Sequence, residues 1–183
     1  LRELVTISPF SVMHSLPLPY HLYVARRFDE AITAAQEMQV RSPQFSMHWF
    51  LAKVYWQQGR FDEALEQERL EFEGRGDTVL LAAMEEGVDA AGPTGAMRAM
   101  AETLVARASE TYVDPFDIAE AFARAEMVDE TLYWLVKAVE HGSYKINYLA
   151  FWPLVDVVRD DPRYQDLLER VYGPRTQDIR RTS

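Results

Sequence analysis

The apolar residues between positions 45 and 73 follow two helical patterns with a single glycine between them. Gly59 interrupts the pattern as a glycine at the C-terminal end of a helix does. Over residues 61–73 the pattern resumes through Phe61, Ala64 and Leu65. This stretch therefore predicts two helices joined by a tight turn. Over residues 45–58 the apolar side chains recur mostly at intervals of three and four: Trp49, Leu51, Ala52, Tyr55 and Trp56.

The sequence Arg-Phe-Asp-Glu-Ala occurs at residues 27–31 and again, 33 residues later, at 60–64. Self-similarity at a fixed period near 34 is typical of helical repeat arrays. We therefore expect about four helix pairs, each with a first and a second helix, that bury their apolar faces mainly against their neighbours. The register extends to four positions about one period apart: Ala31, Ala64, Met97 and Thr131.

Prolines and glycines make two of these repeats irregular. Pro17 and Pro19 lack a backbone donor, so the first helix of the first repeat is expected to begin near Pro19 and to end near Arg26. In the fourth repeat, Asp114-Pro115 predicts the start of a helix, because proline suits an early helical position. The third repeat is expected to contain a longer or looser turn, since it holds Gly87, Gly92, Pro93 and Gly95.

The first seven residues have the pattern of the last turns of a second helix. This pattern ends at Pro9. The pattern of the next second helix ends near Pro43, one period later. The chain therefore opens inside a repeat and lacks an initiator methionine, and we expect it to be a fragment of a larger protein.

Composition is that of an ordinary globular domain, with 48% apolar and 26% charged residues. No apolar run approaches the roughly 18 residues of a membrane span, and no secretory signal precedes the repeats. Cysteine is absent, which excludes disulfides, thiolate metal sites and cysteine catalysis. We expect a cytoplasmic protein without a membrane contact, or a periplasmic one if its parent is membrane-anchored.

The net charge of −10 is concentrated in residues 61–120, which hold 15 acidic and 4 basic side chains. Nucleic acid binding requires clustered Lys and Arg, so this segment is not expected to bind nucleic acid. Two interpretations of the acidic stretch remain. It is either a solvated face that maintains solubility, or a surface that attracts a basic peptide or domain.

The repeated motifs of this sequence resemble a tetratricopeptide repeat array. Leu51-Ala52-x2-Tyr55 and Ile118-Ala119-x2-Phe122 match the first part of the family pattern, and Ala31 and Pro43 match the last part. Alanine replaces the usual glycine in both early motifs, and Glu68 stands where an aromatic residue is usual. The resemblance implies an all-α fold, a right-handed superhelical stack of antiparallel helix pairs with a C-terminal capping helix.

The same resemblance implies one repeat domain over residues 1–183. Its expected parts are the end of a truncated preceding repeat, four repeats, a cap and a tail, at residues 1–9, 10–43, 44–76, 77–111, 112–145, 146–174 and 175–183. The C-terminal half, with Trp134-Leu135-x2-Ala138 and then Asp161-Pro162-Arg163-Tyr164, resembles the last repeats and cap of large bacterial signalling proteins. In those proteins such a segment follows a winged helix, a nucleotide cyclase or a protein kinase domain.

Arrays of this family bind partners on the concave surface lined by the first helices. Trp49, Lys53 and Trp56 lie at i, i+4 and i+7, so they share one helix face. Two alternatives remain for the tryptophans, which either anchor a peptide around the lysine or pack between repeats. Carried over by register, the expected peptide- or partner-binding residues are Tyr20, Tyr23, Trp49, Lys53, Trp56, Gln57, Glu86, Asp89, Phe116, Glu120 and Arg124.

Some binding modes and chemistries find no support in the sequence. Asn147 is the single asparagine, so the asparagine-based peptide clamps of the family are not expected. We find no metal-binding histidine motif, phosphate loop or nucleophile elbow, and we expect neither catalysis nor a metal or cofactor. The leading interpretation is a protein-interaction module in a regulatory or signalling protein. The alternative is a scaffold for self-association, in which Leu4, Val5 and Ile7 form an apolar end that dimerises.

Overall fold

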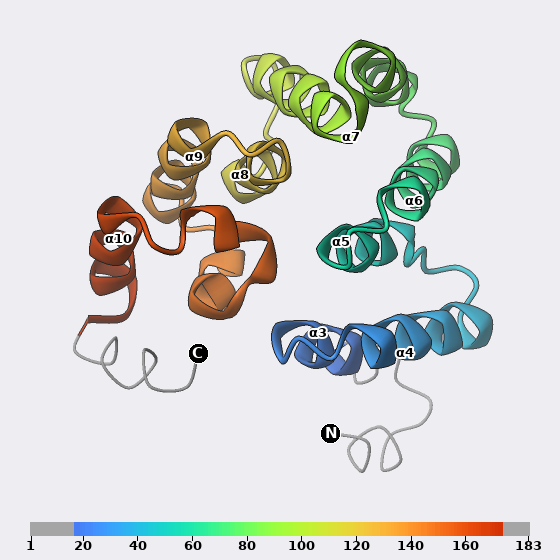
Figure 1. Ribbon diagram of the computed structural model, residues 1–183, viewed down its shortest axis with the longest axis horizontal. Coiled ribbons are helices and arrows are strands. Elements are labelled where there is room, and N and C mark those ends of the chain that lie inside the picture. Colours follow the sequence, from blue (N-terminus) through green and yellow to red (C-terminus); the bar gives the residue numbers. More distant parts are fainter. Residues whose placement is uncertain (1–16, 174–183) are drawn as a thin grey trace. The chain divides into compact units, whose positions relative to one another are not determined.

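The computed structural model describes residues 17–173, and within them every regular element is a helix, which confirms the all-α fold class (Figure 1). The chain forms two compact units, residues 1–77 and 78–183. The N-terminal unit is described from residue 17 and the C-terminal unit up to residue 173. Leu4, Val5 and Ile7, the expected preceding repeat at 1–9 and the expected tail at 175–183 lie outside the described residues.

The described part of the N-terminal unit, from residue 17, contains four helices in two consecutive pairs. Each helix packs against the next along the chain (Figure 1). Within the described residues the first helix spans Pro17–Val24, close to the expected start near Pro19, and both prolines lie in its first turn, where a missing backbone N–H loses no helical hydrogen bond. The four helices are α3 (Pro17–Val24), α4 (Phe28–Arg41), α5 (His48–Gln57) and α6 (Phe61–Arg75).

In three of the helix pairs, the two helices are joined by a turn of the same geometry. Arg26, Gly59 and Glu126 have left-handed φ values of 57°, 70° and 60°. In each case the next backbone N–H donates to the carbonyl five residues before it, at 2.8 to 3.0 Å, which satisfies a helix-end carbonyl. The spacings of 33 and 67 residues agree with the repeat seen in the sequence. Gly59 confirms the predicted helix end.

The four register positions Ala31, Ala64, Met97 and Thr131 are all fully buried. Ala31 and Ala64 lie in the first turn of α4 and α6, where a larger side chain would push the paired helices apart. The period therefore marks positions where helices pack closely.

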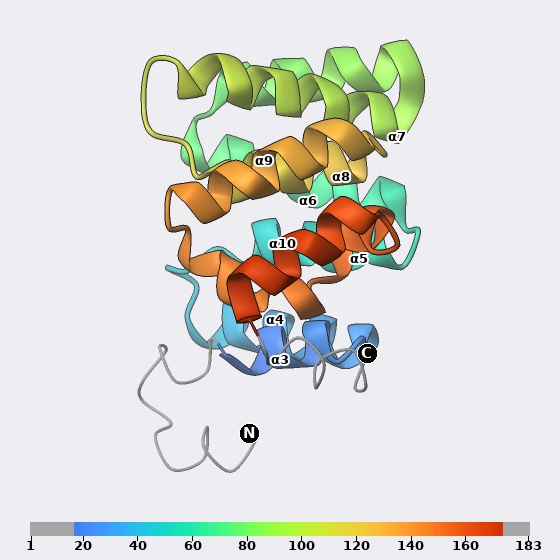
Figure 2. The same ribbon diagram turned by 90° about the vertical axis from the view of Figure 1, so that its left-hand side faces the viewer.

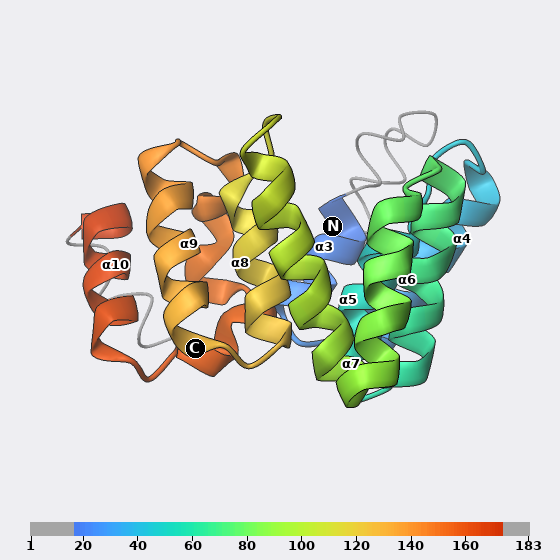
Figure 3. The same cartoon turned by 90° about the horizontal axis from the view of Figure 1, so that it is seen from above.

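The C-terminal unit begins with α7 (Thr78–Ala108), which is two helical arms joined at a kink, as Figure 3 shows. The backbone leaves helical geometry at Ala91 and Gly92, and the second arm resumes at Pro93. A Cβ atom on Gly87 would lie 2.5 Å from the carbonyl oxygen of Gly95, so the arms touch backbone to backbone. The expectation of a longer or looser turn is therefore wrong, because these glycines permit close approach.

The next pair consists of α8 (Pro115–Arg124) and α9 (Val128–Glu140). Asp114 caps α8, since its Oδ1 accepts a hydrogen bond from the backbone N–H of Phe116 at 2.9 Å. This confirms the predicted helix start at Asp114-Pro115. The Ser143 hydroxyl donates to Asp114 Oδ2 at 3.0 Å, which connects the residues after α9 to the cap of α8.

The chain then forms two 3₁₀ segments, η1 (Tyr144–Phe151) and η2 (Pro153–Val158), and the helix α10 (Pro162–Tyr172). α10 packs against α9 and η1 (Figure 2). Such irregular backbone needs other partners for its carbonyl groups. Side chains supply them: Tyr164 Oη donates to Leu149 O at 2.8 Å, Tyr172 Oη to Ile146 O at 2.9 Å, and Arg159 Nη1 to Ala150 O at 2.8 Å.

These tyrosines predict a loss of stability at alkaline pH. Burial raises the pKa of Tyr164 and Tyr172 above the ordinary value of 10.0. Because the unfolded chain ionises first, the stabilising contribution is intact below pH 10 and is lost as the pH rises above it. Each tyrosine can remove up to about 1.4 kcal/mol per pH unit from the free energy of unfolding.

Urea denaturation at a series of pH values checks this expectation. Tyr164→Phe should lower the free energy of unfolding by about 1 kcal/mol at pH 7, through the lost hydrogen bond, and should flatten its decline above pH 10. A decline as steep in the variant as in the wild type would contradict the assignment.

Candidate functional site

The expected partner-binding residues of the N-terminal unit cluster around Trp49 on α5. The ring of Tyr20, from α3, lies 5.8 Å from the Trp49 ring and 5.4 Å from that of Phe50. Lys53, one turn after Trp49, places Nζ 5.5 Å from the centre of the Trp49 ring. The structure therefore brings together an aromatic pair from two first helices and a cation, as cation–π contacts require.

Met47, the residue before α5, provides no side-chain cap, and other side chains hold the start of this helix. Trp49 Nε1 donates to the Ser46 carbonyl oxygen at 3.1 Å, which fixes the orientation of the indole. The His48 ring bridges α4 and α6, with Nδ1 2.7 Å from Gln67 Oε1 and Nε2 3.1 Å from Gln39 Nε2. These contacts hold the helix that presents Trp49.

Trp56, two turns after Trp49, contacts Phe61 of α6 edge to face at 4.8 Å between ring centres. Both tryptophans are half-buried, so each packs against a neighbouring helix and also presents part of its ring to solvent. The packing that the sequence offered as one alternative is therefore present, and peptide anchoring by the exposed part of the side chains stays a prediction. We call the half-buried set of Tyr20, Trp49, Lys53, Trp56 and Gln57 the aromatic face.

Tyr23 differs from this set because its side chain is fully buried. Its ring packs between Phe28 of α4, at 5.9 Å, and Phe50 of α5, at 5.8 Å. Tyr23 is therefore a core residue of the N-terminal unit, and its side chain is not exposed on the surface.

In the C-terminal unit the expected residues of α8 are also buried. Phe116, Glu120 and Arg124 are at most 6% exposed. η2 packs against α8, and Trp152, just before it, lies with its ring 6.1 Å from Phe116 and its Nε1 hydrogen-bonded to Glu120 Oε1. The prediction that these three residues are exposed for contact with a partner is therefore wrong, because a later segment of the chain covers this face of α8.

Glu86 and Asp89, the remaining expected residues, are exposed on the first arm of α7. In a chain with a net charge of −10, exposed carboxylates are expected to be solvated. Their exposure distinguishes them from the buried residues of α8.

Charge is divided between first and second helices in the N-terminal unit. Lys53 is the one formally charged residue in α3 and α5, whereas α4 and α6 together carry nine acidic and three basic residues. Several of these carboxylates are paired. A hydrogen bond from Arg60 lowers the pKa of Glu63, and one from Arg69 lowers that of Glu66. The helices α4 and α6 next to the aromatic face are therefore net negative, whereas the face itself carries the positive charge of Lys53.

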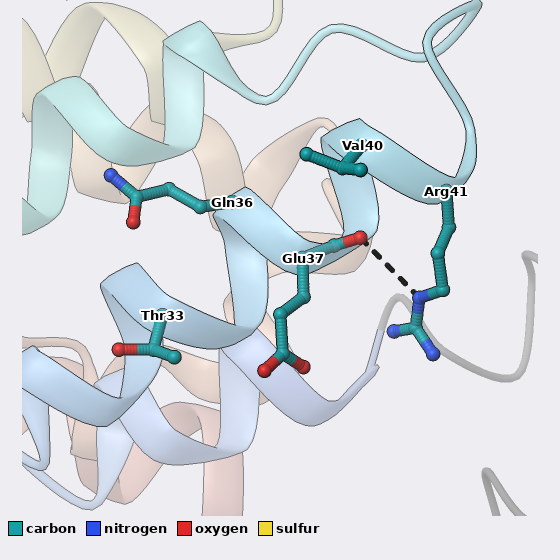
Figure 4. A pocket seen from close by; sticks show the side chains of 5 residues that line it. All are labelled: Thr33, Gln36, Glu37, Val40 and Arg41. Atoms are coloured by element: carbon teal, nitrogen blue, oxygen red, sulfur yellow. Dashed lines mark hydrogen bonds between the residues drawn. The ribbon is translucent and has the colours of Figure 1, made fainter.

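A shallow groove on α4, which the sequence did not predict, runs along the side of the helix shown in Figure 4. Arg41 Nε donates to the Glu37 carbonyl oxygen at 3.3 Å, so this contact caps the helix end. Val40, at 81% exposure, is its most apolar feature. Among its described lining residues, no reactive pair of side chains converges. The described lining residues are Thr33, Gln36, Glu37, Val40 and Arg41.

Within residues 17–173, no group of three or more His, Asp or Glu side chains is arranged to hold a metal ion. In the same part of the chain, no helix has both the length and the apolar character that crossing a membrane demands. Comparisons with protein-family models, curated proteins and solved structures found no match to this chain.

Proposed function

We propose that this chain is a tetratricopeptide-type repeat module that binds a segment of a partner protein on the aromatic face. The proposal includes a right-handed stack of helix pairs closed by α10, in the regulatory part of a larger signalling protein. Support for the repeat type comes from the shared turn geometry at Arg26, Gly59 and Glu126. It also comes from the four buried register positions.

The observation that carries the binding function is the half-buried cluster of Tyr20, Trp49 and Lys53. Aromatic side chains that are partly packed and partly exposed supply contact area at a low entropic cost, because their neighbours already restrict them. Tryptophan and tyrosine are also the residues that most often dominate binding energy at protein interfaces. The cluster therefore has the composition of an anchor site.

The test uses a displayed library of random twelve-residue peptides, selected against the whole chain. Trp49→Ala is expected to weaken binding of the selected peptides at least about tenfold, because the central anchor is lost. Trp49→Leu, which keeps an apolar side chain against Phe50, is expected to weaken binding less. Affinity is measured by titration calorimetry, with far-UV circular dichroism as the check on folding.

Tyr133→Ala is the matched control. Tyr133 is an exposed aromatic residue of α9, its ring lies 5.3 Å from Trp134, and Lys137 lies over it at 5.8 Å. It reproduces the local chemistry of the aromatic face on a second helix. Equal binding by wild type and both folded Trp49 variants would remove the assignment, as would an equal loss in Tyr133→Ala.

A further inference from the structure

We propose that the shallow groove on α4 is a contact surface for a second copy of this chain, in which two α4 helices pack antiparallel around Val40. The self-association expected from the sequence uses the first seven residues, so the α4 groove is a different interface. It shares no residue with the aromatic face, and this inference does not depend on the proposed function. The described residues of the α4 groove are Thr33, Gln36, Glu37, Val40 and Arg41.

Val40 supplies the apolar contact of the α4 groove. At 81% exposure it is the most exposed large apolar side chain in the part of the chain that the structure describes, and it lies near the end of the helix (Figure 4). A single exposed valine is ordinary on a protein surface. It becomes informative here because its neighbours on the same side of the helix, Glu37 and Arg41, carry opposite charges.

Glu37 and Arg41 do not pair with each other, although they lie one helical turn apart. Arg41 Nε donates to the backbone carbonyl oxygen of Glu37 at 3.3 Å, and within residues 17–173 no ion pair joins their side chains (Figure 4). Arg98 and Glu102, which have the same spacing on α7, do form an ion pair at 2.8 Å. Both charges of the α4 groove can therefore pair with groups on a partner.

The other two carboxylates of α4 already have partners in the same chain. Gln58 donates to Asp29 Oδ1 at 2.8 Å, and Arg27 pairs with Glu30 at 2.5 Å. The α4 groove itself holds one glutamate and one arginine, so it has no net charge in a chain whose net charge is −10. Two copies can therefore meet there without facing like charges, whereas an acidic segment such as residues 61–120 would repel a second copy.

The α4 groove is complementary to itself when the two helices run antiparallel. A two-fold axis near Val40 places Glu37 of each copy opposite Arg41 of the other, because residues before the axis then face residues after it. Each Val40 lies between Gln36 and Val40 of the second copy. A parallel arrangement would place the two Glu37 side chains together, which costs affinity. One helix face buries less than the roughly 800 Å² per partner of a standard interface, so we expect a weak dimer.

Sedimentation equilibrium of the whole chain, from about 10 µM to about 1 mM, measures this dimer, for which we expect a dissociation constant of about 100 µM. Glu37→Arg and Arg41→Glu are each expected to weaken it at least about tenfold, because each variant places like charges opposite one another. The double variant with both changes restores opposite charges, and it is expected to dimerise about as tightly as the wild type.

An equimolar mixture of the two single variants tests the antiparallel arrangement directly. One chain then carries two arginines at these positions and the other carries two glutamates, so every charge in a mixed dimer faces an opposite charge. The mixture is expected to dimerise at least as tightly as the wild type, although neither variant does so alone. A contact between α4 and some other surface of the chain would not give this result.

Val79→Glu is the matched control for Val40→Glu. Val79 is an exposed valine on α7, outside the α4 groove, with 60% exposure. Val40→Glu is expected to weaken the dimer at least about tenfold, and Val79→Glu is expected to leave it unchanged. Far-UV circular dichroism checks that each variant is folded.

Three outcomes would overturn the proposal. The first is a wild-type chain that stays monomeric up to about 1 mM. The second is a dimer that Val40→Glu weakens no more than Val79→Glu does, which would place self-association on another surface. The third is a mixture of the two charge variants that associates no more tightly than each variant alone.

Discussion

Gly87→Ala is expected to lower the free energy of unfolding of the C-terminal unit by about 3 kcal/mol. The new Cβ would lie 2.5 Å from Gly95 O and 2.7 Å from Ala96 Cα, both of which are backbone atoms. A flexible side chain could move away, but here the two arms of α7 must separate. Amide hydrogen exchange of α7 measures the effect, because protection of these amides reports the opening of the unit that contains them.

Gly74→Ala is the matched control for this prediction. Gly74 lies within α6, and a Cβ atom at that position meets nothing within 4 Å. Alanine there should raise the free energy of unfolding by about 0.5 kcal/mol, because a helical glycine loses more backbone entropy on folding. A Gly87→Ala protein with wild-type protection in α7 would show that the arms do not depend on the glycine contact.

The contact at Gly87 also shows why the prediction of a longer or looser turn in this segment was wrong. Glycine and proline close together in a sequence usually indicate a loop, and the sequence carries no distance between two helices. In the structure Gly92 provides the left-handed turn, whereas Gly87 and Gly95 provide room for two backbones. The period of 33 to 34 residues places Met97 in register with Ala31 and Ala64, and the structure shows that Met97 is fully buried as they are.

The candidate site was predictable where one helix determined it. Trp49 and Lys53 are four residues apart on α5, so their contact follows from helical geometry. Phe116, Glu120 and Arg124 share one face of α8 by the same rule, but the sequence pattern does not say what covers that face. The covering segment is irregular 3₁₀ structure, for which period-based reasoning gives no face. The apolar run around Trp152-Pro153 was the available signal.

Trp152→Ala is expected to lower the free energy of unfolding of the C-terminal unit by about 4 kcal/mol. The side chain is 3% exposed, its ring packs on Phe116, and its indole N–H donates to the carboxylate of Glu120, which is 2% exposed. Truncation leaves a large cavity and removes a donor from a buried carboxylate, and both effects destabilise the folded state. Urea denaturation followed by circular dichroism at 222 nm gives the magnitude.

Two further variants separate packing from hydrogen bonding. Trp152→Phe keeps an aromatic ring against Phe116 but lacks the indole N–H, so it is expected to cost about 1 to 3 kcal/mol. Phe151→Ala, at the neighbouring position with 38% exposure, is expected to cost less than about 1 kcal/mol. If Trp152→Ala were no more destabilising than Phe151→Ala, the face of α8 would not depend on Trp152. Phe116 and Glu120 would then be accessible to a partner, as the repeat register first predicted. If the loss is as large as expected, Trp152 occupies that face of α8 as part of the fold. The proposed partner binding would then use the aromatic face of α3 and α5 instead.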